Sequence, residues 1–247
     1  MLETNMPDAP TAAILIIGDE ILSGRTKDRN VGFIAETLTD IGIDLEEVRI
    51  VADREAAIVE ALRALADRYD FVFTSGGIGP THDDITADSV AKAFGLPIDI
   101  DQRAVDLLMP FWKSRCIEPN EARLRMARIP EGAELITNTV SAAPGFRVRN
   151  VFVMAGVPAI MQVMMDEVVK SLPASRPVLS ETIEARRGEG DIAVPAAKVQ
   201  TDFPGVRIGS YPYHDGERFT TRLVLRSRDG DALAAAKAAM EEALKAL

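Results

Sequence analysis

The stretch FVFTSGGIGPTHDD, residues 71–84, opens with a short apolar run at 71–73 and carries three glycines within four positions, 76–79. The glycines are Gly76, Gly77 and Gly79. A glycine-rich turn between a buried strand and a helix is typical of a phosphate-binding loop, because glycine allows close backbone approach and the helix N-terminus attracts anions. The stretch is neither a Walker loop nor a GxGxxG dinucleotide fingerprint. A tight strand-to-helix turn without a ligand is the alternative interpretation.

Acidic residues end the same stretch, which is unusual for a loop that binds phosphate. Asp83 and Asp84 close it, and Asp88 follows in the predicted helix. These carboxylates would repel a bare phosphate by several kcal/mol in a site that excludes water. A divalent cation removes the conflict, since Mg²⁺ is usually held by carboxylates together with substrate phosphates. The alternative is that some of these aspartates only cap the helix, and for Asp88 this is the preferred interpretation.

Further polar residues follow other predicted strands. Gly18, Asp19 and Glu20 come after the first strand, and Asp53 comes after the second. The segment 156–158, Gly-Val-Pro, is a fourth strand-to-helix turn that could hold another part of a ligand. The carboxyl ends of parallel strands meet at one edge of a sheet, where ligands bind. Any one of these acids alone can be a loop residue or a cap, but together they predict one ligand site.

Strand and helix signals alternate through the first two-thirds of the chain. The continuous apolar run at 12–17 is typical of a strand covered on both faces. This alternation predicts a mostly parallel sheet with helices on both faces. The other strands are expected at 43–51, 71–74 and 151–154. The helices are expected around 34–41 and 58–65, from a Thr86 N-cap to Gly95, over 101–127 with breaks at Pro110 and Pro119, and from 158 to about 172.

The pattern changes after residue 172, where Pro173, Ser175 and Pro177 suggest a linker. We therefore predict a mobile tail at 1–10, a large domain at 11–172 and a small α+β domain at 176–247. In the small domain, residues 219–227 alternate with period two, which indicates a half-exposed antiparallel strand. Its expected neighbour is 206–210, joined through a turn at 211–216. A C-terminal helix with Leu233, Met240, Leu244 and Leu247 on one stripe completes a β-α-β-β-α order.

Composition excludes several classes of protein. The formal net charge is −10, which argues against a broad nucleic-acid-binding surface. No apolar stretch approaches the ~20 residues of a membrane span, and the N-terminus lacks the pattern of a signal peptide. The single cysteine, Cys116, allows no disulfide within the chain and fits a reducing compartment. We expect a cytoplasmic protein with no nucleic-acid or membrane partner.

These motifs resemble those of a known family. Gly18-Asp19-Glu20, Asn30, Asp53 and the run from Gly76 to Thr86 are similar to the molybdopterin-binding (MoaB/Mog) domain family. The motif TSGGIGPTHDDIT, residues 74–86, is even more similar to the N-terminal part of the family's competence/damage-inducible (CinA) branch. The resemblance covers about residues 11–172. The segment PGVRIGSYP, residues 204–212, extends it to the second domain of that branch.

The resemblance implies a fold and a class of ligand. The fold is a three-layer α/β/α domain, followed by a small KH-like domain. The ligand is a pterin or nucleotide held through its phosphates. One branch adenylylates molybdopterin with Mg-ATP, and the CinA-like branch is associated with a metal-dependent pyrophosphatase that acts on ADP-ribose and related dinucleotides. The C-terminal amidase domain of full-length CinA is not expected here, because the chain has no room for it.

The resemblance also implies roles for individual residues. Asp53 and Asp84 are the expected catalytic residues. Mg²⁺, Mn²⁺ or Co²⁺ is the expected metal, with Glu20, Asp53, Asp83 and Asp84 as candidate ligands. The remaining candidates are expected to bind the pterin or nucleotide: Gly18, Asp19, Asn30, Ser75, Gly76, Gly77, Gly79, Thr81, Thr86, Gly156 and Pro158. The sequence departs from the usual Pro-Gly-Val-Pro turn in having Ala155 before Gly156.

Two functions remain open on this basis. One is metal-dependent hydrolysis of nucleotide pyrophosphates, in which His82 either assists or is an exposed loop residue. The other is binding of molybdopterin without chemistry. Three basic residues, Arg25, Lys27 and Arg29, either belong to a lid that closes over the ligand or to a solvated loop. A homodimer or homotrimer is expected by analogy with the family.

Overall fold

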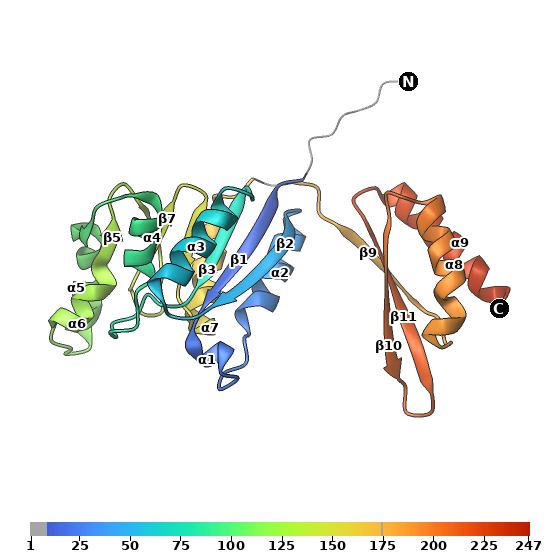
Figure 1. The fold of residues 1–247 in the computed structure, drawn as a ribbon, viewed down its shortest axis with the longest axis horizontal. Coiled ribbons are helices and arrows are strands. Elements are labelled where there is room, and N and C mark those ends of the chain that lie inside the picture. Colours follow the sequence, from blue (N-terminus) through green and yellow to red (C-terminus); the bar gives the residue numbers. More distant parts are fainter. Residues whose placement is uncertain (1–8, 174) are drawn as a thin grey trace, which may run out of the picture. The chain divides into compact units, whose positions relative to one another are not determined.

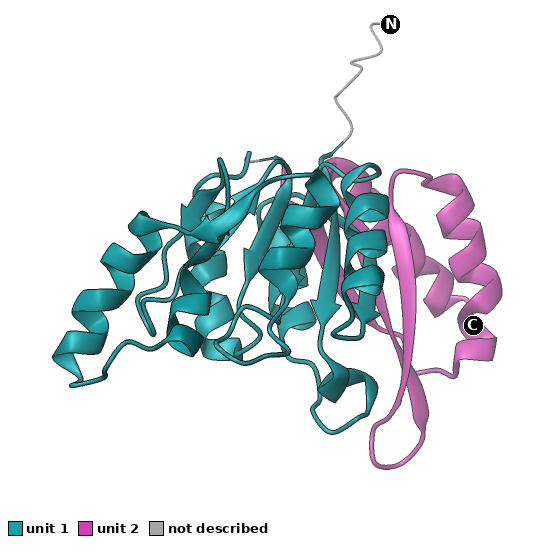
Figure 2. Cartoon of the chain, turned by 60° about the vertical axis from the view of Figure 1, so that its left-hand side comes forward, with its two compact units in different colours: residues 1–175 teal, residues 176–247 magenta. Residues whose placement is uncertain are grey.

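The computed structural model describes residues 9–173 and 175–247 of the 247-residue chain. The chain divides into two compact units, residues 1–175 and 176–247 (Figure 2). Most of the predicted tail at 1–10 lies outside the described residues. Pro10 is already tied to the first unit, because its carbonyl accepts a hydrogen bond of 2.9 Å from the Asp44 N–H.

A six-stranded sheet forms the centre of the first unit, with the strand order β2-β1-β3-β8-β7-β6 (Figure 1). Strands β2, β1, β3 and β8 are parallel, whereas β7 and β6 run antiparallel to them. This confirms the predicted mostly parallel sheet. The bounds are β1 (Thr11–Ile17), β2 (Asp44–Val51), β3 (Phe71–Ser75), β6 (Glu134–Ile136), β7 (Gly145–Val148) and β8 (Val151–Met154).

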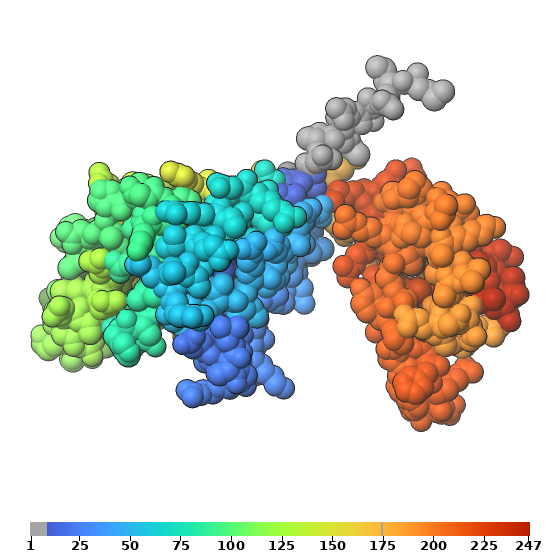
Figure 3. Space-filling view, in the orientation of Figure 1, coloured from blue at the N-terminus to red at the C-terminus, as the bar shows by residue number. Residues whose placement is uncertain are grey.

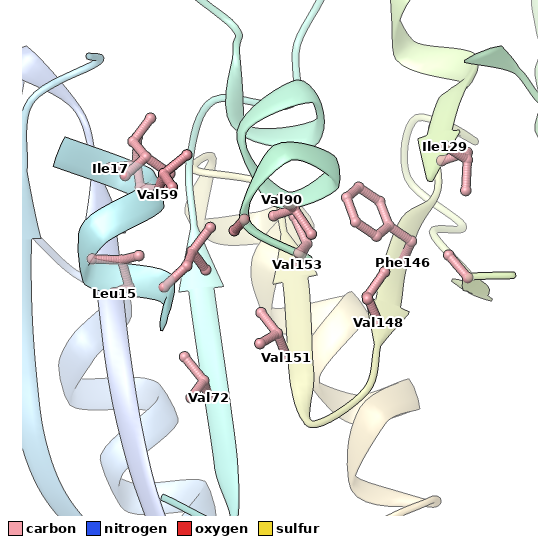
Figure 4. Close-up of a cluster of buried hydrophobic side chains, with 14 of the residues drawn as sticks. Leu15, Ile17, Val59, Val72, Val90, Ile129, Phe146, Val148, Val151 and Val153 are labelled. Carbon is pink, nitrogen blue, oxygen red and sulfur yellow. The ribbon is translucent and has the colours of Figure 1, made fainter. Parts of the chain in front are cut away.

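Helices cover both faces of this sheet, which gives the three layers expected from the resemblance. Alternate residues of β1 enter different cores: Leu15 and Ile17 pack on one side, and Ile14 and Ile16 on the other. Figure 4 shows part of the first core, where Val90 of a helix lies near Val153 of β8. The helices on that side include α3 (Glu55–Ala66) and α4 (Thr86–Phe94), and those on the other side are α2 (Asn30–Asp40) and α7 (Pro158–Val169).

Residues 98–130 leave the main sheet and form a small appendage. Strand β4 (Ile98–Ile100) pairs with β5 (Arg128–Pro130), and α5 (Gln102–Ser114), α6 (Glu121–Leu124) and the 3-10 helix η1 (Arg125–Ala127) lie between them. The predicted break at Pro110 is wrong, because α5 continues through it. Pro110 is exposed, and the buried stripe of Ala104, Leu108 and Trp112 holds the helix on both sides of it.

The start of α4 also differs from the prediction. Thr86 is the first helical residue and Ile85 occupies the N-cap position. The Thr86 hydroxyl does not cap the helix, because it donates a hydrogen bond of 2.9 Å to the Gly76 carbonyl. The predicted end is confirmed: Gly95 adopts the left-handed conformation, with φ of 67°.

The second unit has the predicted β-α-β-β-α order and its own buried core. The strand order is β10-β11-β9, and all pairs are antiparallel. The predicted turn at 211–216 is wrong, since β10 extends to His214 and leaves only residues 215–218 for the turn. Leu247 lies beyond the last helix and is 48% exposed. The bounds are β9 (Leu179–Glu184), α8 (Glu189–Asp202), β10 (Arg207–His214), β11 (Phe219–Ser227) and α9 (Gly230–Lys245).

Candidate functional site

The loops that follow β1, β2, β3 and β8 meet at one edge of the first unit's sheet, as parallel strands require. The loop before β7 reaches the same edge, because Phe146 near the start of β7 pairs with Val153 near the end of β8. A cavity of about 630 Å³ opens between these loops. The predicted site residues that line it are Gly18, Glu20, Asp53, Gly76, Gly77, Gly79, Asp83, Asp84, Gly156 and Pro158.

Packing explains why the first two glycines of the loop are needed. Gly76 has a φ of 115°, and a Cβ there would lie 2.1 Å from the Ile17 carbonyl oxygen. Gly77 has a φ of 70°, and a Cβ there would lie 2.2 Å from the Thr86 hydroxyl oxygen. The loop therefore passes so close to β1 and α4 that only glycine fits.

The same loop presents open hydrogen-bond donors. Within the described residues, the structure gives no protein acceptor for the backbone N–H groups of Gly77, Ile78 and Gly79. The N–H groups on either side are paired: that of Gly76 donates to the Met154 carbonyl, and that of Thr81 donates to Asp84. Backbone donors that lack a partner at a cavity wall suit an anionic ligand.

Carboxylates surround these donors. Asp53 is half-buried and accepts a hydrogen bond of 2.8 Å from the Asp19 N–H. Burial raises the pKa of Asp53, and the negative charges of Asp19, Glu20 and Asp83 raise it further. The mutual repulsion means that these acids, although they follow three different strands, share one electrostatic site.

Asp84 is held in a fixed position within the glycine loop. Its carboxylate accepts hydrogen bonds from both the backbone N–H and the hydroxyl of Thr81. Its carbonyl accepts a hydrogen bond of 3.2 Å from the Arg125 guanidinium. Both interactions keep the carboxylate at the cavity without neutralising it by an ion pair.

Across residues 9–173 and 175–247, no three or more His, Cys, Asp or Glu side chains stand close enough together to hold a metal ion on their own. The four candidate ligands, Glu20, Asp53, Asp83 and Asp84, all line the cavity, but they do not form such a cluster. A cation here would therefore need oxygen atoms from a bound ligand to complete its coordination.

Several predicted ligand-binding residues lie behind the loops instead of lining the cavity. The Asn30 amide donates to the Ser75 hydroxyl at 2.7 Å and to the Gly156 carbonyl at 2.8 Å, and the Ser75 hydroxyl donates to the Ala155 carbonyl at 3.2 Å. The Asn30 Oδ1 atom is buried and has no partner among the described residues. Asn30 thus connects α2 to the loops after β3 and β8.

Some sequence candidates lie away from the cavity. Asp88 pairs with Arg128 at 2.5 Å, makes no capping hydrogen bond at the start of α4, and is not among the residues that line the cavity. The His82 side chain is almost fully exposed. Arg25, Lys27 and Arg29 are exposed on the segment that follows the short helix α1 (Asp19–Leu22), which protrudes from the first unit (Figure 3).

Sequence reasoning missed the other wall of the cavity. Its side chains are mostly apolar and come from η1, the β6–β7 loop and α7. Methionines and alanines in such positions carry no sequence signal that separates a pocket from a core. The missed lining residues include Met126, Asn138, Ser141, Ala143, Ile160 and Met164.

Residues 13–179 match the family described as a probable molybdopterin binding domain. The chain therefore belongs to the molybdopterin-binding domain family, and the resemblance to the MoaB/Mog domain is confirmed. Residues 177–247 match the FAD synthase middle domain, a relationship that the sequence motifs did not indicate. No helix in the described part of the chain is both long and apolar enough to cross a membrane.

Individual relatives add detail. A protein of Archaeoglobus fulgidus is 34% identical over 81% of this chain and 84% of its own length. A probable FAD synthase of Caenorhabditis briggsae is 31% identical over 95% of this chain, but the chain spans only 49% of that relative. The crystal structure of CinA from Thermoplasma acidophilum is 34% identical and has a TM-score of 0.61, covering 66% of this chain and 98% of that one. The likeness to CinA is thus confirmed for the first unit.

Proposed function

We propose that the first unit binds a dinucleotide through its pyrophosphate group and hydrolyses the pyrophosphate bond in the presence of a divalent cation. One observation carries the proposal: Gly77, Ile78 and Gly79, whose backbone N–H groups have no acceptor among the described residues, line a cavity that is also lined by four carboxylates. Donors favour an anion, whereas carboxylates oppose it unless a cation lies between them.

The residues present fit a divalent cation. Glu20, Asp53, Asp83 and Asp84 offer carboxylate oxygen ligands at the cavity. When bound, the cation would offset the charge of the phosphates and polarise a phosphoryl oxygen.

The chain's own residues would bind the phosphate and accept the proton of the attacking water. The N–H groups of the glycine loop would hold the phosphate that does not react. Asp53 is suited to accept a proton from the attacking water, because burial and its acidic neighbours raise its pKa and so make it a stronger base than an ordinary aspartate. Water adds to one phosphorus, the bridging P–O bond breaks, and the products are two monophosphates such as AMP and its partner.

The relatives guide the choice of substrate. Probable FAD synthases match nearly the whole chain, and the second unit matches the middle domain of FAD synthase. FAD is a dinucleotide with a pyrophosphate bridge, so it joins ADP-ribose and NAD as a candidate substrate. Since the chain spans about half of those relatives, synthesis of FAD is not part of the proposal.

A second candidate function is binding of a molybdopterin-type pterin without hydrolysis. The name of the matching family favours it. So does the absence, among the described residues, of a preformed group of three metal-binding side chains. It predicts tight pterin binding and no turnover with any metal.

The test is product analysis by chromatography after incubation with FAD, ADP-ribose or NAD and Mg²⁺, Mn²⁺ or Co²⁺. Hydrolysis should release AMP from the wild type and from Asp99→Asn, a surface aspartate away from the cavity, but not from Asp84→Asn. If no metal and substrate together yield AMP, the pyrophosphatase proposal is wrong. A molybdopterin titration would then test the second candidate.

A further inference from the structure

The cavity has two chemically different ends, and their order follows the order of the strands. The acidic residues belong to the loops after β2, β1 and β3. The apolar wall lies toward β8 and β7. Neighbouring strands lie about 4.8 Å apart, so the loops at β2 and β7, four spacings away from each other, are separated by roughly 19 Å. The cavity is therefore long enough for a ligand with a charged part and a separate apolar part.

The apolar end offers a surface for a flat ring. Ile160 and Met164 of α7, Ala143 and Met126 line it together with Val157, which is 57% exposed. Apolar side chains exposed in a concave site, next to a few polar groups, are typical of small-molecule pockets.

A turn at residues 138–143 closes this end, and Asn138 builds it. Asn138 is 4% exposed. Its amide donates to the Ser141 hydroxyl at 2.6 Å and to the Ala143 carbonyl at 2.9 Å. Its Oδ1 atom accepts from the N–H groups of Val140 and Ser141 at 2.9 and 3.3 Å. With both donors used and its oxygen occupied, Asn138 is committed to the turn and not to a ligand.

Ser141 is in a different situation. Its oxygen accepts the Asn138 hydrogen bond, but within the described residues the structure gives no acceptor for its hydroxyl proton. The residue lines the cavity among apolar side chains. Asn138 therefore leaves Ser141 as a hydroxyl donor at the apolar end.

We infer that this end of the cavity binds the heterocyclic base of the nucleotide, and that Ser141 determines specificity by donating to a ring nitrogen or carbonyl of that base. The inference rests on the proposed function, since it assigns the base-binding end of the same cavity. A donor in an apolar wall discriminates well, because a base without an acceptor there leaves the hydroxyl unpaired. The phosphates then lie over the glycine loop, toward the acids.

The test compares two probes by isothermal titration calorimetry in the presence of Mg²⁺. One probe is the α,β-methylene analogue of ADP, and the other is methylenediphosphonate, which has the same charged group and no base. Ser141→Ala should weaken binding of the first probe about tenfold and change that of the second by less than about twofold. Ser141→Thr, which keeps a hydroxyl, should bind both probes nearly as the wild type does. Ser114→Ala, at an exposed serine of α5, is the matched control.

Other outcomes would overturn the inference. If the wild type and Ser141→Ala bind the ADP analogue with equal affinity, the assignment of Ser141 is wrong, whereas the proposed function is unaffected. Equal weakening of both probes shows that Ser141 supports the turn only. A wild type that binds neither probe contradicts both this inference and the proposed function.

Discussion

Gly76 begins the candidate phosphate-binding loop, but close packing alone already requires a glycine at this position. Its φ of 115° and its closeness to the Ile17 carbonyl require glycine whether or not a ligand binds. The next residues, Gly77, Ile78 and Gly79, favour an anion, because their N–H groups have no protein acceptor within the described residues. A glycine motif alone therefore does not establish a phosphate site, but the open donors beside it support one.

Gly76→Ala should destabilise the first unit by about 1–3 kcal/mol from backbone strain, with a further cost from the clash with Ile17. Gly32→Ala is the control, because this exposed glycine of α2 has no atom within 4 Å of an added Cβ. The control should gain roughly 0.5–1 kcal/mol from helix propensity. Urea unfolding followed by circular dichroism measures both, and equal stabilities of the two variants would contradict the packing argument.

Asp53 should lower stability at neutral pH in the metal-free protein. Burial raises its pKa, so the folded state holds the Asp53 proton more tightly than the unfolded state does. Stability is therefore lost as the pH rises through the folded pKa. Asp53→Asn, which can still accept from the Asp19 N–H, should be more stable than the wild type at neutral pH and about equally stable below the ordinary aspartate pKa. The free energy of unfolding measured in EDTA across this range checks it, and a pH-independent difference would be the contrary result.

At the scale of elements, α2 has a role that its amphipathic pattern does not indicate. The apolar spacing predicts which face of α2 packs on the sheet, and Ile34 and Leu38 are indeed buried there. Asn30, at the first helical position, is also buried and connects the helix to two strand-to-loop transitions. The helix thereby fixes the relative position of the glycine loop and of Gly156.

Asn30→Ala should cost about 1–2 kcal/mol, because the Gly156 carbonyl and the Ser75 hydroxyl lose their shared donor. Asn30→Asp should cost more at neutral pH. A buried carboxylate of the same shape cannot donate, and it would face the Gly156 carbonyl. Thermal unfolding of the two variants ranks them, and an Asp variant as stable as the wild type would show that the hydrogen bonds contribute little.

The elements that could be predicted from the sequence are those with a clear pattern of apolar residues. The run at 12–17 predicted β1 correctly because burial on both faces leaves no polar position. Strands β6 and β7 have only three and four residues, too few for a period to show. Pro110 was misread because tertiary packing at Leu108 and Trp112 outweighs its local effect. The acidic wall of the cavity could be predicted from strand ends, whereas the apolar wall depends on tertiary contacts alone.

At the scale of the whole molecule, the chain consists of two units with separate cores. Every residue of the candidate site belongs to the first unit. The second unit matches a different family from the first, the FAD synthase middle domain. Its formal charge is zero, so the net charge of −10 belongs entirely to residues 1–175. An acidic first unit is consistent with a site that recruits a cation.

Leu223 is fully buried in the core of the second unit, and Leu62 is fully buried in that of the first. Leu223→Ala should destabilise the second unit by about 2–5 kcal/mol. Hydrogen exchange followed by mass spectrometry should show faster exchange confined to residues 176–247, with nucleotide binding retained. Leu62→Ala should instead destabilise the first unit, with faster exchange confined to that unit. Faster exchange of both units in each variant would contradict the assignment of separate cores.

The proposed function requires a cation between the nucleotide's pyrophosphate and the carboxylates of the cavity. The most direct measurement is calorimetric titration of the α,β-methylene analogue of ADP-ribose, which cannot be hydrolysed at that bridge, with Mg²⁺ and with EDTA. We expect binding with Mg²⁺, little or none with EDTA, and loss of the Mg²⁺ dependence in Asp53→Asn combined with Asp84→Asn. Equally tight binding of the wild type under both conditions would contradict this requirement.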